Sequence, residues 1–302
     1  MSLKELVKRR DYLLPGSSAC SGCGLMIALK IFLKILGQRT ILVIPASCAG
    51  VLSGNYPRAS FQVITINTAF ETAASLASGV SAALEMRRID DVQVLAWAGD
   101  GATFDIGLQA LSNAAQGNEN ILYVCDDNES YMNTGIQSSG ATPYGAWTTT
   151  TPLGKRTHKK NIMGIMLAHK IPYLASASPS FPVDLMKKVS KAKDIQGTRF
   201  IHLLVPCPTG WRFSPSLTIK IGRLAVETGM WILYEYHKGH MMLTGASRYI
   251  AEGKLKKKPI EEYLSLQGRF NQASSEETTE IQRWVDSKWE ELKALVDASP
   301  PT

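Results

Sequence analysis

Two short apolar runs, each followed by a polar motif, constrain the fold of this chain more than any other feature. Residues 92–98 precede Gly99-Asp100-Gly101, and residues 121–125 precede a polar run that begins at Asp127. Such runs indicate buried strands, and the apolar spacing within residues 104–116 between them predicts a helix. Strand, helix and strand within about thirty residues form a βαβ unit with parallel strands. The sequence therefore predicts an open α/β sheet with both motifs at the carboxyl ends of neighbouring strands, where such sheets bind ligands.

The two motifs have the composition of a site for a magnesium diphosphate. Mg²⁺ takes about six oxygen ligands, and Asp100 offers a carboxylate while Asn128 offers an amide oxygen. Gly99 and Gly101 allow the backbone to approach phosphate, and a helix that begins after them directs its amides at the anion. Gly-Asp-Gly alone is also typical of an ordinary strand-to-helix turn. The asparagine at the matching strand end, followed by Asn133-Thr134-Gly135, favours a cofactor site.

These motifs resemble those of a known family. Gly99-Asp100-Gly101, with Asn128 twenty-eight positions after Asp100, resembles the thiamine-diphosphate-binding fingerprint. The run 127–145 (DNESYMNTGIQSSGATPYG) is similar to the β subunit of pyruvate:ferredoxin oxidoreductase and of related 2-oxoacid:ferredoxin oxidoreductases. The likeness extends from about Pro15 to Glu227 and includes 206–211 (PCPTGW). Agreement over most of the chain is more specific than one short motif.

The resemblance implies a fold, a reaction and a set of ligands. The fold is a mostly parallel sheet flanked by helices, the pyrophosphate-binding domain of thiamine enzymes. The reaction is the oxidative decarboxylation of pyruvate or a related 2-oxoacid, with electrons passed to ferredoxin. Magnesium is assigned to Asp100, Asn128 and the Ser130 carbonyl, and the catalytic candidate near the thiazolium ring or substrate is Asn133. Thiamine diphosphate as a whole is assigned to Gly99, Asp100, Gly101, Asn128, Ser130, Asn133 and Thr134.

Four of the five cysteines form a candidate metal site. Cys20 and Cys23 form a C-x2-C pair, Cys48 lies twenty-five positions further on, and Cys207 comes much later. Disulfides are disfavoured in a cytoplasmic chain, so the pair suggests metal ligation or redox exchange. Four thiolates hold either zinc or a [4Fe-4S] cluster, and their spacing does not choose between them. Cys125, inside an apolar strand, is expected to be a buried thiol.

The position of the four cysteines makes the cluster the preferred interpretation. Each lies at an expected strand end or helix start, on the rim where the diphosphate is expected. The resemblance assigns Cys20, Cys23, Cys48 and Cys207 to a [4Fe-4S] cluster that takes electrons from the thiamine intermediate. A structural zinc ion is the alternative, although a redox-inert ion has no evident role beside an electron-rich cofactor.

The expected partners follow from what the chain lacks. In the resembling family, the glutamate that activates thiamine belongs to a separate pyrimidine-binding domain, and we find no second domain of that kind in 302 residues. We therefore expect the chain to be inactive alone. The implied partners are an α-type pyrimidine-binding subunit, a ferredoxin-like cluster subunit or domain, ferredoxin as electron acceptor and a small 2-oxoacid, with coenzyme A as a candidate acceptor.

Three alternatives remain open at the level of sequence. Arg58 stands where the family has a more aromatic run. Its positive charge would suit a substrate with a second carboxylate, such as oxalate, although a surface or subunit contact explains it as well. A non-redox thiamine-dependent decarboxylase subunit would explain the motifs but not the four cysteines. A non-catalytic assembly protein with a zinc or cluster site would leave Asp100 and Asn128 without a purpose.

Bulk properties limit the remaining classes of function. We expect residues 1–214 to form the cofactor-binding domain and residues 215–302 to form a C-terminal extension that wraps the core or contacts a partner. The formal charge of +7 indicates a solvated surface or attraction to an acidic partner, and no nucleic-acid motif accompanies it. No apolar run is long enough to span a membrane and no signal-peptide core is present, so we expect a cytoplasmic protein.

Overall fold

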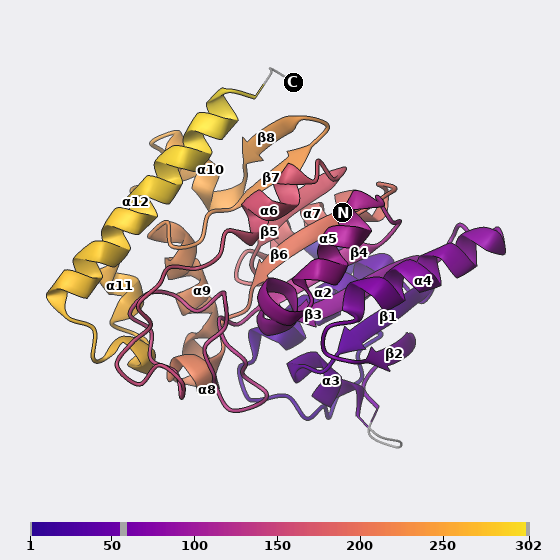
Figure 1. The fold of residues 1–302 in the computed structure, drawn as a ribbon, viewed down its shortest axis with the longest axis horizontal. Helices are drawn as coiled ribbons and strands as arrows, with labels where there is room; N and C mark the ends of the chain where they lie inside the picture. Colours follow the sequence, from indigo (N-terminus) through magenta and orange to yellow (C-terminus); the bar gives the residue numbers. More distant parts are fainter. Residues whose placement is uncertain (1, 55–58, 300–302) are drawn as a thin grey trace.

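A single twisted sheet of eight strands organises the chain in the computed structural model, which describes residues 2–54 and 59–299 (Figure 1). The strand order is β2-β1-β3-β4-β6-β5-β7-β8. All pairings from β2 to β5 are parallel, whereas β7 and β8 are antiparallel additions at one edge. The strands are β1 (Thr40–Pro45), β2 (Ile64–Thr68), β3 (Gln93–Gly99), β4 (Leu122–Asp127), β5 (Tyr173–Ala177), β6 (Arg199–Leu204), β7 (Tyr234–His237) and β8 (His240–Leu243). The predicted mostly parallel α/β fold is confirmed.

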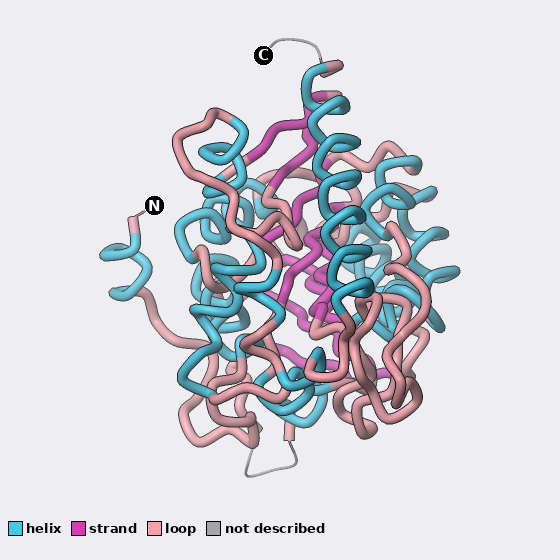
Figure 2. The backbone as a smooth tube through the Cα atoms, turned by 90° about the vertical axis from the view of Figure 1, so that its left-hand side faces the viewer, coloured by secondary structure: helices cyan, strands magenta, loops and turns pink. Residues whose placement is uncertain are grey.

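Helices cover both faces of this sheet (Figure 2). The α-helices are α1 (Leu3–Lys8), α2 (Gly24–Leu36), α3 (Cys48–Ser53), α4 (Ala73–Met86), α5 (Leu108–Gln116), α6 (Ile162–Ala168), α7 (Pro182–Lys193), α8 (Pro208–Trp211), α9 (Thr218–Glu227), α10 (Gly245–Ala251), α11 (Glu261–Leu264) and α12 (Ser275–Asp297). Shorter turns are the π-helical η1 (Gly101–Ile106) and the 3₁₀ turns η2 (Pro215–Leu217) and η3 (Gly268–Phe270).

The alternation of side chains along the central strands produces two separate cores. In β3, Leu95 and Trp97 pack against α2 on one face, whereas Val94 and Ala96 pack towards α4 and α5 on the other. Successive strand residues point to opposite faces, so a strand covered on both sides must be apolar at every position. This explains why the sequence shows continuous apolar runs where the central strands lie.

The helix between β3 and β4 begins differently from the prediction. The expected single helix over 104–116 is preceded by the π-helical turn η1, and the regular α5 begins only at Leu108. The amide of Gly107 donates to the carbonyl of Ala102 at 2.9 Å, five residues back. A Cβ at position 107 would collide with that carbonyl, so the wide turn requires glycine there. The turn sits directly after Asp100 and sets the direction in which the helix leaves the site.

The C-terminal region adds to the same sheet. β7 pairs with β5, and the tight turn at Lys238 and Gly239, both at positive φ, returns the chain as β8. A third core cluster surrounds Trp211 with side chains from α9, α11 and α12, and α12 runs along the outside of the molecule (Figure 1). The division into a cofactor-binding domain, residues 1–214, and an extension, residues 215–302, stays a prediction.

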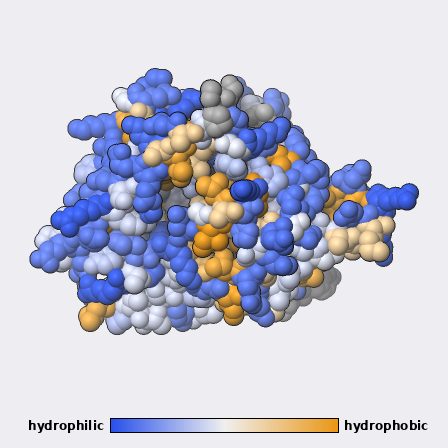
Figure 3. Space-filling model, turned by 45° about the horizontal axis from the view of Figure 1, so that its top comes forward, coloured by the Kyte–Doolittle hydropathy of each residue, from blue (hydrophilic) through white to orange (hydrophobic). Residues whose placement is uncertain are grey.

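The surface carries its charges in a dispersed manner. The face shown in Figure 3 is mostly hydrophilic, with a band of apolar surface across its middle. Seventeen contacts between a lysine or arginine and a carboxylate occur among the described residues, so many of the basic side chains have acidic neighbours. Within residues 2–54 and 59–299, no helix combines the length and the apolar character needed to cross a membrane. The cytoplasmic location stays a prediction.

One buried lysine ties the C-terminal region to the sheet, and its loss should destabilise the chain. Lys188 is 1% exposed, and its ammonium contacts Asp184, the carbonyl of Ser176 and the hydroxyl of Thr244 at 2.6–2.7 Å. Replacing it by methionine leaves a nearly buried carboxylate unpaired, so Lys188→Met should lower the free energy of unfolding by about 3 kcal/mol in urea denaturation. The exposed neighbour Lys187 supplies the matched control. Equal unfolding free energies for Lys188→Met and Lys187→Met would contradict this role.

Candidate cofactor site

The predicted cofactor residues lie together at the carboxyl ends of β1, β3 and β4. All seven line one cavity of about 150 Å³. The lining residues are Ala46, Ser47, Cys48, Phe70, Gly99, Asp100, Gly101, Ala102, Asp126, Asn128, Ser130, Tyr131, Met132, Asn133 and Thr134. A cavity of about 180 Å³ between α6 and α12 contains none of the predicted site residues. The rim of the sheet is therefore the candidate site.

Three oxygen atoms converge in this cavity. The side-chain amide of Asn128 places its oxygen 3.2 Å from Asp100 Oδ1 and 2.7 Å from the carbonyl oxygen of Ser130. Turning the amide over would let its nitrogen donate to both acceptors, which satisfies them without a cation. With the oxygen inward, the three acceptors need a cation among them. Neighbouring oxygens in an octahedral Mg²⁺ shell lie about 3 Å apart, because each Mg–O bond is about 2.1 Å long. The same spacing therefore fits either a donating amide nitrogen of Asn128 or a magnesium ion that binds its oxygen.

A buried hydroxyl holds Asp100 in this orientation. Ser139 Oγ donates to Asp100 Oδ2 at 2.5 Å and accepts from the amide of Ala141 at 3.1 Å. Because this bond occupies Oδ2, it leaves Oδ1 towards Asn128. Burial, reinforced by the nearby charge of Asp127, raises the pKa of Asp100 well above its usual value. A bound cation would act in the opposite direction by favouring the carboxylate.

The tyrosine after Ser130 forms one wall of the cavity. The ring of Tyr131 lies over Gly101, where a Cβ would collide with it. Its hydroxyl donates to Asp105 Oδ2 at 2.8 Å, and its ring packs edge-on against Phe70. Glycine at 101 is thus required by close packing within the chain, a reason that the sequence analysis did not identify. Asn133 and Thr134 are exposed at the mouth of the cavity.

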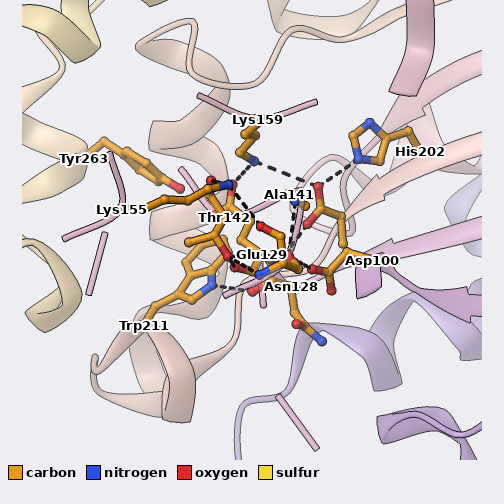
Figure 4. A network of polar contacts seen from close by, with 12 residues as sticks. Asp100, Asn128, Glu129, Ala141, Thr142, Lys155, Lys159, His202, Trp211 and Tyr263 are labelled. Carbon is orange, nitrogen blue, oxygen red and sulfur yellow. Dashed lines mark hydrogen bonds and ion pairs between the residues drawn. The ribbon is translucent and has the colours of Figure 1, made fainter. Parts of the chain in front are cut away.

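Behind the cavity lies a buried charged network (Figure 4). His202 Nε2 lies 2.8 Å from Asp127 Oδ2, and Lys159 lies near both Asp127 and Glu129. Burial opposes ionisation of Asp127, but Lys159 and His202 outweigh it and hold its pKa below the usual value. Burial lowers the pKa of His202 despite Asp127. A neutral imidazole therefore donates to an ionised carboxylate, and no metal is needed to explain this histidine.

The turn that carries Cys207 is connected to the magnesium candidates. The indole of Trp211 is fully buried and donates to the carbonyl of Asn128 at 2.7 Å. The backbone amide of Trp211 donates to the carbonyl of Cys207 at 2.9 Å. The guanidinium of Arg269, which comes from the C-terminal region, stacks on the indole at 3.9 Å. These long-range partners were not identified from the sequence, because no local motif links position 269 to position 128.

The four candidate cluster cysteines lie on the same rim. Cys20 and Cys23 occupy the loop before α2, Cys48 begins α3 after β1, and Cys207 caps α8 after β6. Burial raises the pKa of Cys48, and Asp126 and the other three cysteines raise it further. The four thiols are therefore within electrostatic range of one another. In the described part of the chain, however, no three or more ligating side chains are placed to hold one metal ion.

Two further cysteine predictions can be compared with the structure. All five cysteines are free thiols, so no disulfide joins Cys20 to Cys23. Cys125 is completely buried in β4, which confirms the expectation of a buried thiol.

Arg58, on which the oxalate alternative depended, lies outside the described residues.

A buried carboxyl group that was not selected from the sequence, Asp126, lines the same cavity as Cys48. Asp126 is 1% exposed and lines the cavity, and its charge raises the pKa values of Cys23 and Cys48. Its Oδ2 accepts from Trp97 Nε1 at 3.3 Å, whereas Oδ1 has no hydrogen-bond partner. Burial raises the pKa of Asp126 to about 7, although the bond from Trp97 opposes the shift.

Comparison with known proteins identifies the family. Residues 46–203 match the family described as "Thiamine pyrophosphate enzyme, C-terminal TPP binding domain". The pyruvate synthase subunit PorB of Methanothermobacter marburgensis is 48% identical over 292 residues, which cover 95% of this chain and 99% of that protein. This chain belongs to the β subunits of the 2-oxoacid:ferredoxin oxidoreductases. It is accordingly a subunit of a thiamine-diphosphate-dependent oxidoreductase that acts as part of a complex.

Other members of the family agree in length. The ketoisovalerate oxidoreductase subunit VorB of Pyrococcus abyssi is 45% identical over 313 residues, covering 98% of this chain and 99% of that protein. A solved structure, "2-oxoglutarate:ferredoxin oxidoreductase from Magnetococcus marinus with 2-oxoglutarate, coenzyme A and succinyl-CoA bound", has a TM-score of 0.61 at 19% identity and covers 86% of this chain and 91% of that one. That likeness supports the fold of this β subunit.

The raised pKa of Asp126 gives a pH-dependent prediction for the chain purified without iron. The folded state favours the protonated carboxyl, so the contribution of Asp126 to wild-type stability should fall as pH rises from about 4 to about 7 and then level off. Asp126→Asn mimics the protonated form. It should match wild type below about pH 4 and exceed it by about 4 kcal/mol above pH 7 in urea denaturation. Asp194→Asn, at an exposed position, is the control. A pH-independent difference for Asp126→Asn would contradict this interpretation.

Proposed function

We propose that this β subunit binds the magnesium diphosphate of thiamine and a [4Fe-4S] cluster, within a complex that oxidatively decarboxylates pyruvate or a closely related 2-oxoacid and reduces ferredoxin. The single observation that carries the proposal is the convergence of Asp100, Asn128 and the Ser130 carbonyl in a cavity on the rim that also carries four thiols. When bound, thiamine diphosphate supplies an electron sink for the carbanion left by decarboxylation.

The residues of the chain have distinct roles in this proposal. Asp100, Asn128 and the Ser130 carbonyl would hold Mg²⁺, and Ser139 would keep Asp100 in place. The turn that begins at Gly101 would direct backbone amides towards the diphosphate. Asn133 and Thr134, exposed at the mouth, would face the thiazolium ring and the substrate. Asn133 is the proposed catalytic residue of this subunit.

The arrangement of the cysteines supports a cluster more than a zinc ion. A single zinc ion needs its four sulfurs about 2.3 Å from one centre, and no three or more ligating side chains in the described residues are so placed. Cys20, Cys23, Cys48 and Cys207 nevertheless lie within electrostatic range of one another. A cage of four irons and four sulfides is larger than one ion and, unlike zinc, can accept an electron beside the proposed cofactor.

The composition of the cavity supports partner subunits. Its only carboxylates among the described residues are Asp100 and Asp126, and no glutamate lines it there. A carboxylate for the aminopyrimidine ring would therefore come from another chain, the α-type pyrimidine-binding subunit. A ferredoxin-like subunit or domain with further clusters would carry electrons from this chain to ferredoxin. The mostly hydrophilic surface in Figure 3 is compatible with either a solvated face or an acidic partner.

The relatives suggest the class of substrate. Two of them are named pyruvate synthase and ketoisovalerate oxidoreductase subunits, so we infer pyruvate or a branched 2-oxoacid as substrate, with coenzyme A as acceptor. No contact among the described residues favours oxalate, and that alternative rests on Arg58 alone.

Metal analysis of the anaerobically purified complex tests the cluster. We expect about four irons and four sulfides at this site and broad absorption near 400 nm that bleaches on reduction. Because partner subunits would carry further clusters, the comparison is between Cys48→Ala, which should lose about four irons per β subunit, and Cys125→Ala, which should lose none. Zinc in place of iron, or no iron loss in Cys48→Ala, would overturn the cluster assignment.

Turnover of the assembled complex tests the substrate class. We expect ferredoxin reduction with pyruvate or 3-methyl-2-oxobutanoate that depends on coenzyme A, and no reduction by the β subunit alone, because the cavity lacks the pyrimidine-side carboxylate. The assay compares these acids with oxalate, with and without coenzyme A. Faster turnover of oxalate without coenzyme A would reverse the order of the two substrate proposals.

A further inference from the structure

We propose that Glu129 is a positioning residue whose left-handed backbone, held in place by Arg269, aligns the magnesium ligands on either side of it. Glu129 is the single residue between Asn128 and Ser130, and its φ of 67° lies in the region that side-chain-bearing residues rarely adopt. The inference rests on the proposed magnesium site and adds to it a residue that does not itself line the cavity.

The unusual backbone is what brings the two ligands together. In an extended segment, the side chain of one residue and the carbonyl of the second residue after it would not meet at one point. The left-handed turn at Glu129 instead brings the Asn128 amide to 2.7 Å from the Ser130 carbonyl. If Glu129 relaxed to a negative φ, the two oxygens would separate and the magnesium shell would lose one of them.

Both backbone polar groups of Glu129 are fixed. Its amide donates to Asp127 Oδ1 at 2.8 Å, and its carbonyl accepts from Thr142 Oγ1 at 2.6 Å. These two bonds hold the peptide planes on either side of the strained residue. They do not explain why position 129 carries a long acidic side chain.

The side chain of Glu129 is a buried anchor between two cations. It is 2% exposed, and its two oxygens contact Lys159 and Arg269, which is itself 3% exposed. Oε2 accepts no hydrogen bond and lies 2.5 Å from the Arg269 guanidinium nitrogen, so the positive charge is its partner. Removing one member of such a pair leaves a buried uncompensated charge, which makes the pair a strong constraint on geometry.

Arg269 is itself held in place by its neighbours, and it also supports Asn128, the residue before Glu129. Its Nε donates to Gln267 Oε1 at 2.9 Å, and its guanidinium stacks on the ring of Trp211. Trp211 in turn donates to the carbonyl of Asn128 at 2.7 Å. Arg269 therefore contacts Glu129 directly and supports Asn128 through Trp211. Figure 4 shows how Glu129, Asn128 and Trp211 lie.

A matched pair of substitutions separates the backbone effect from the loss of charge. Glu129→Ala and Glu129→Gly remove the same anchor, but only glycine adopts a positive φ without steric cost. In the purified complex, Glu129→Ala should weaken the apparent affinity for Mg²⁺ about tenfold or more, measured as Mg²⁺-dependent quenching of protein fluorescence by thiamine diphosphate. The apparent Mg²⁺ affinity of Glu129→Gly should be at least about threefold higher than that of Glu129→Ala. The kcat at saturating Mg²⁺ should change less than the Mg²⁺ requirement in both variants.

A second pair of variants tests the role of the positive charge of Arg269 if the Glu129 variants fail to assemble. Arg269→Met removes the charge, whereas Arg269→Lys keeps it, so Mg²⁺ affinity should fall about tenfold in the first and by about threefold or less in the second. Thermal melting of the cofactor-free complexes shows which variants are folded. Mn²⁺ binding, followed by electron paramagnetic resonance in the presence of thiamine diphosphate, gives a readout independent of turnover.

The outcomes distinguish failure of this inference from failure of the proposed function. Equal Mg²⁺ affinities for folded Glu129→Ala and Glu129→Gly would overturn the positioning role of the backbone. If neither Glu129 variant folds, equal affinities for Arg269→Met and Arg269→Lys would overturn it. Binding of thiamine diphosphate to the wild-type complex without any dependence on Mg²⁺ would overturn the magnesium site itself, before any variant is compared.

Discussion

The close approach of three polar groups at one end of the sheet, the Asp100 carboxylate, the Asn128 side-chain amide and the Ser130 carbonyl, is the constraint to which much of this structure responds. Asp100, Asn128 and Ser130 present acceptors to one another at 2.7–3.2 Å in a largely buried place. Acceptors at this spacing need either a donor or a cation between them. Neighbouring residues keep these groups in place. Ser139 donates a hydrogen bond to Asp100, and Trp211 donates one to the Asn128 carbonyl. The left-handed backbone of Glu129 sets the direction of the chain between Asn128 and Ser130. The parallel sheet brings the two strand ends together, and the buried network fixes the final geometry.

The sequence was sufficient for the features that depend on local patterns. Continuous apolar runs identified β3 and β4, because a strand covered on both faces is apolar at every position. Motifs at the ends of these strands identified the seven residues that line the cavity. The same reasoning placed Cys48 and Cys207 after β1 and β6, on the rim where the structure has them. The locations of these residues could be predicted because strand direction determines which residues share a rim, whereas their roles as ligands stay predictions.

Features that depend on distant partners could not be read in the same way. The π-helical turn follows from the packing of Gly107 against the Ala102 carbonyl, and the apolar spacing of 104–116 is the same with or without it. The turn of the β7–β8 hairpin has Lys238 at positive φ, where glycine or asparagine is the usual signal. Glu129 and Arg269 reveal their pairing only when the C-terminal region is folded onto the core. Charge and burial, which decide such pairs, are properties of the folded chain.

Arg269 lies 140 residues after Glu129 in the chain, and this separation also bears on how the subunit folds during synthesis. A growing chain emerges from the ribosome N-terminus first, so the βαβ unit with Asp100 and Asn128 is available for folding well before residue 269. Until then, the buried carboxylate of Glu129 lacks one of its two cations. The loop that carries Asn128 and Ser130 can therefore gain its Arg269 contact only after residue 269 has emerged. A truncated product that ends before residue 269 would keep both strand ends of the βαβ unit and yet lack the Arg269 contact that holds the loop between Asn128 and Ser130.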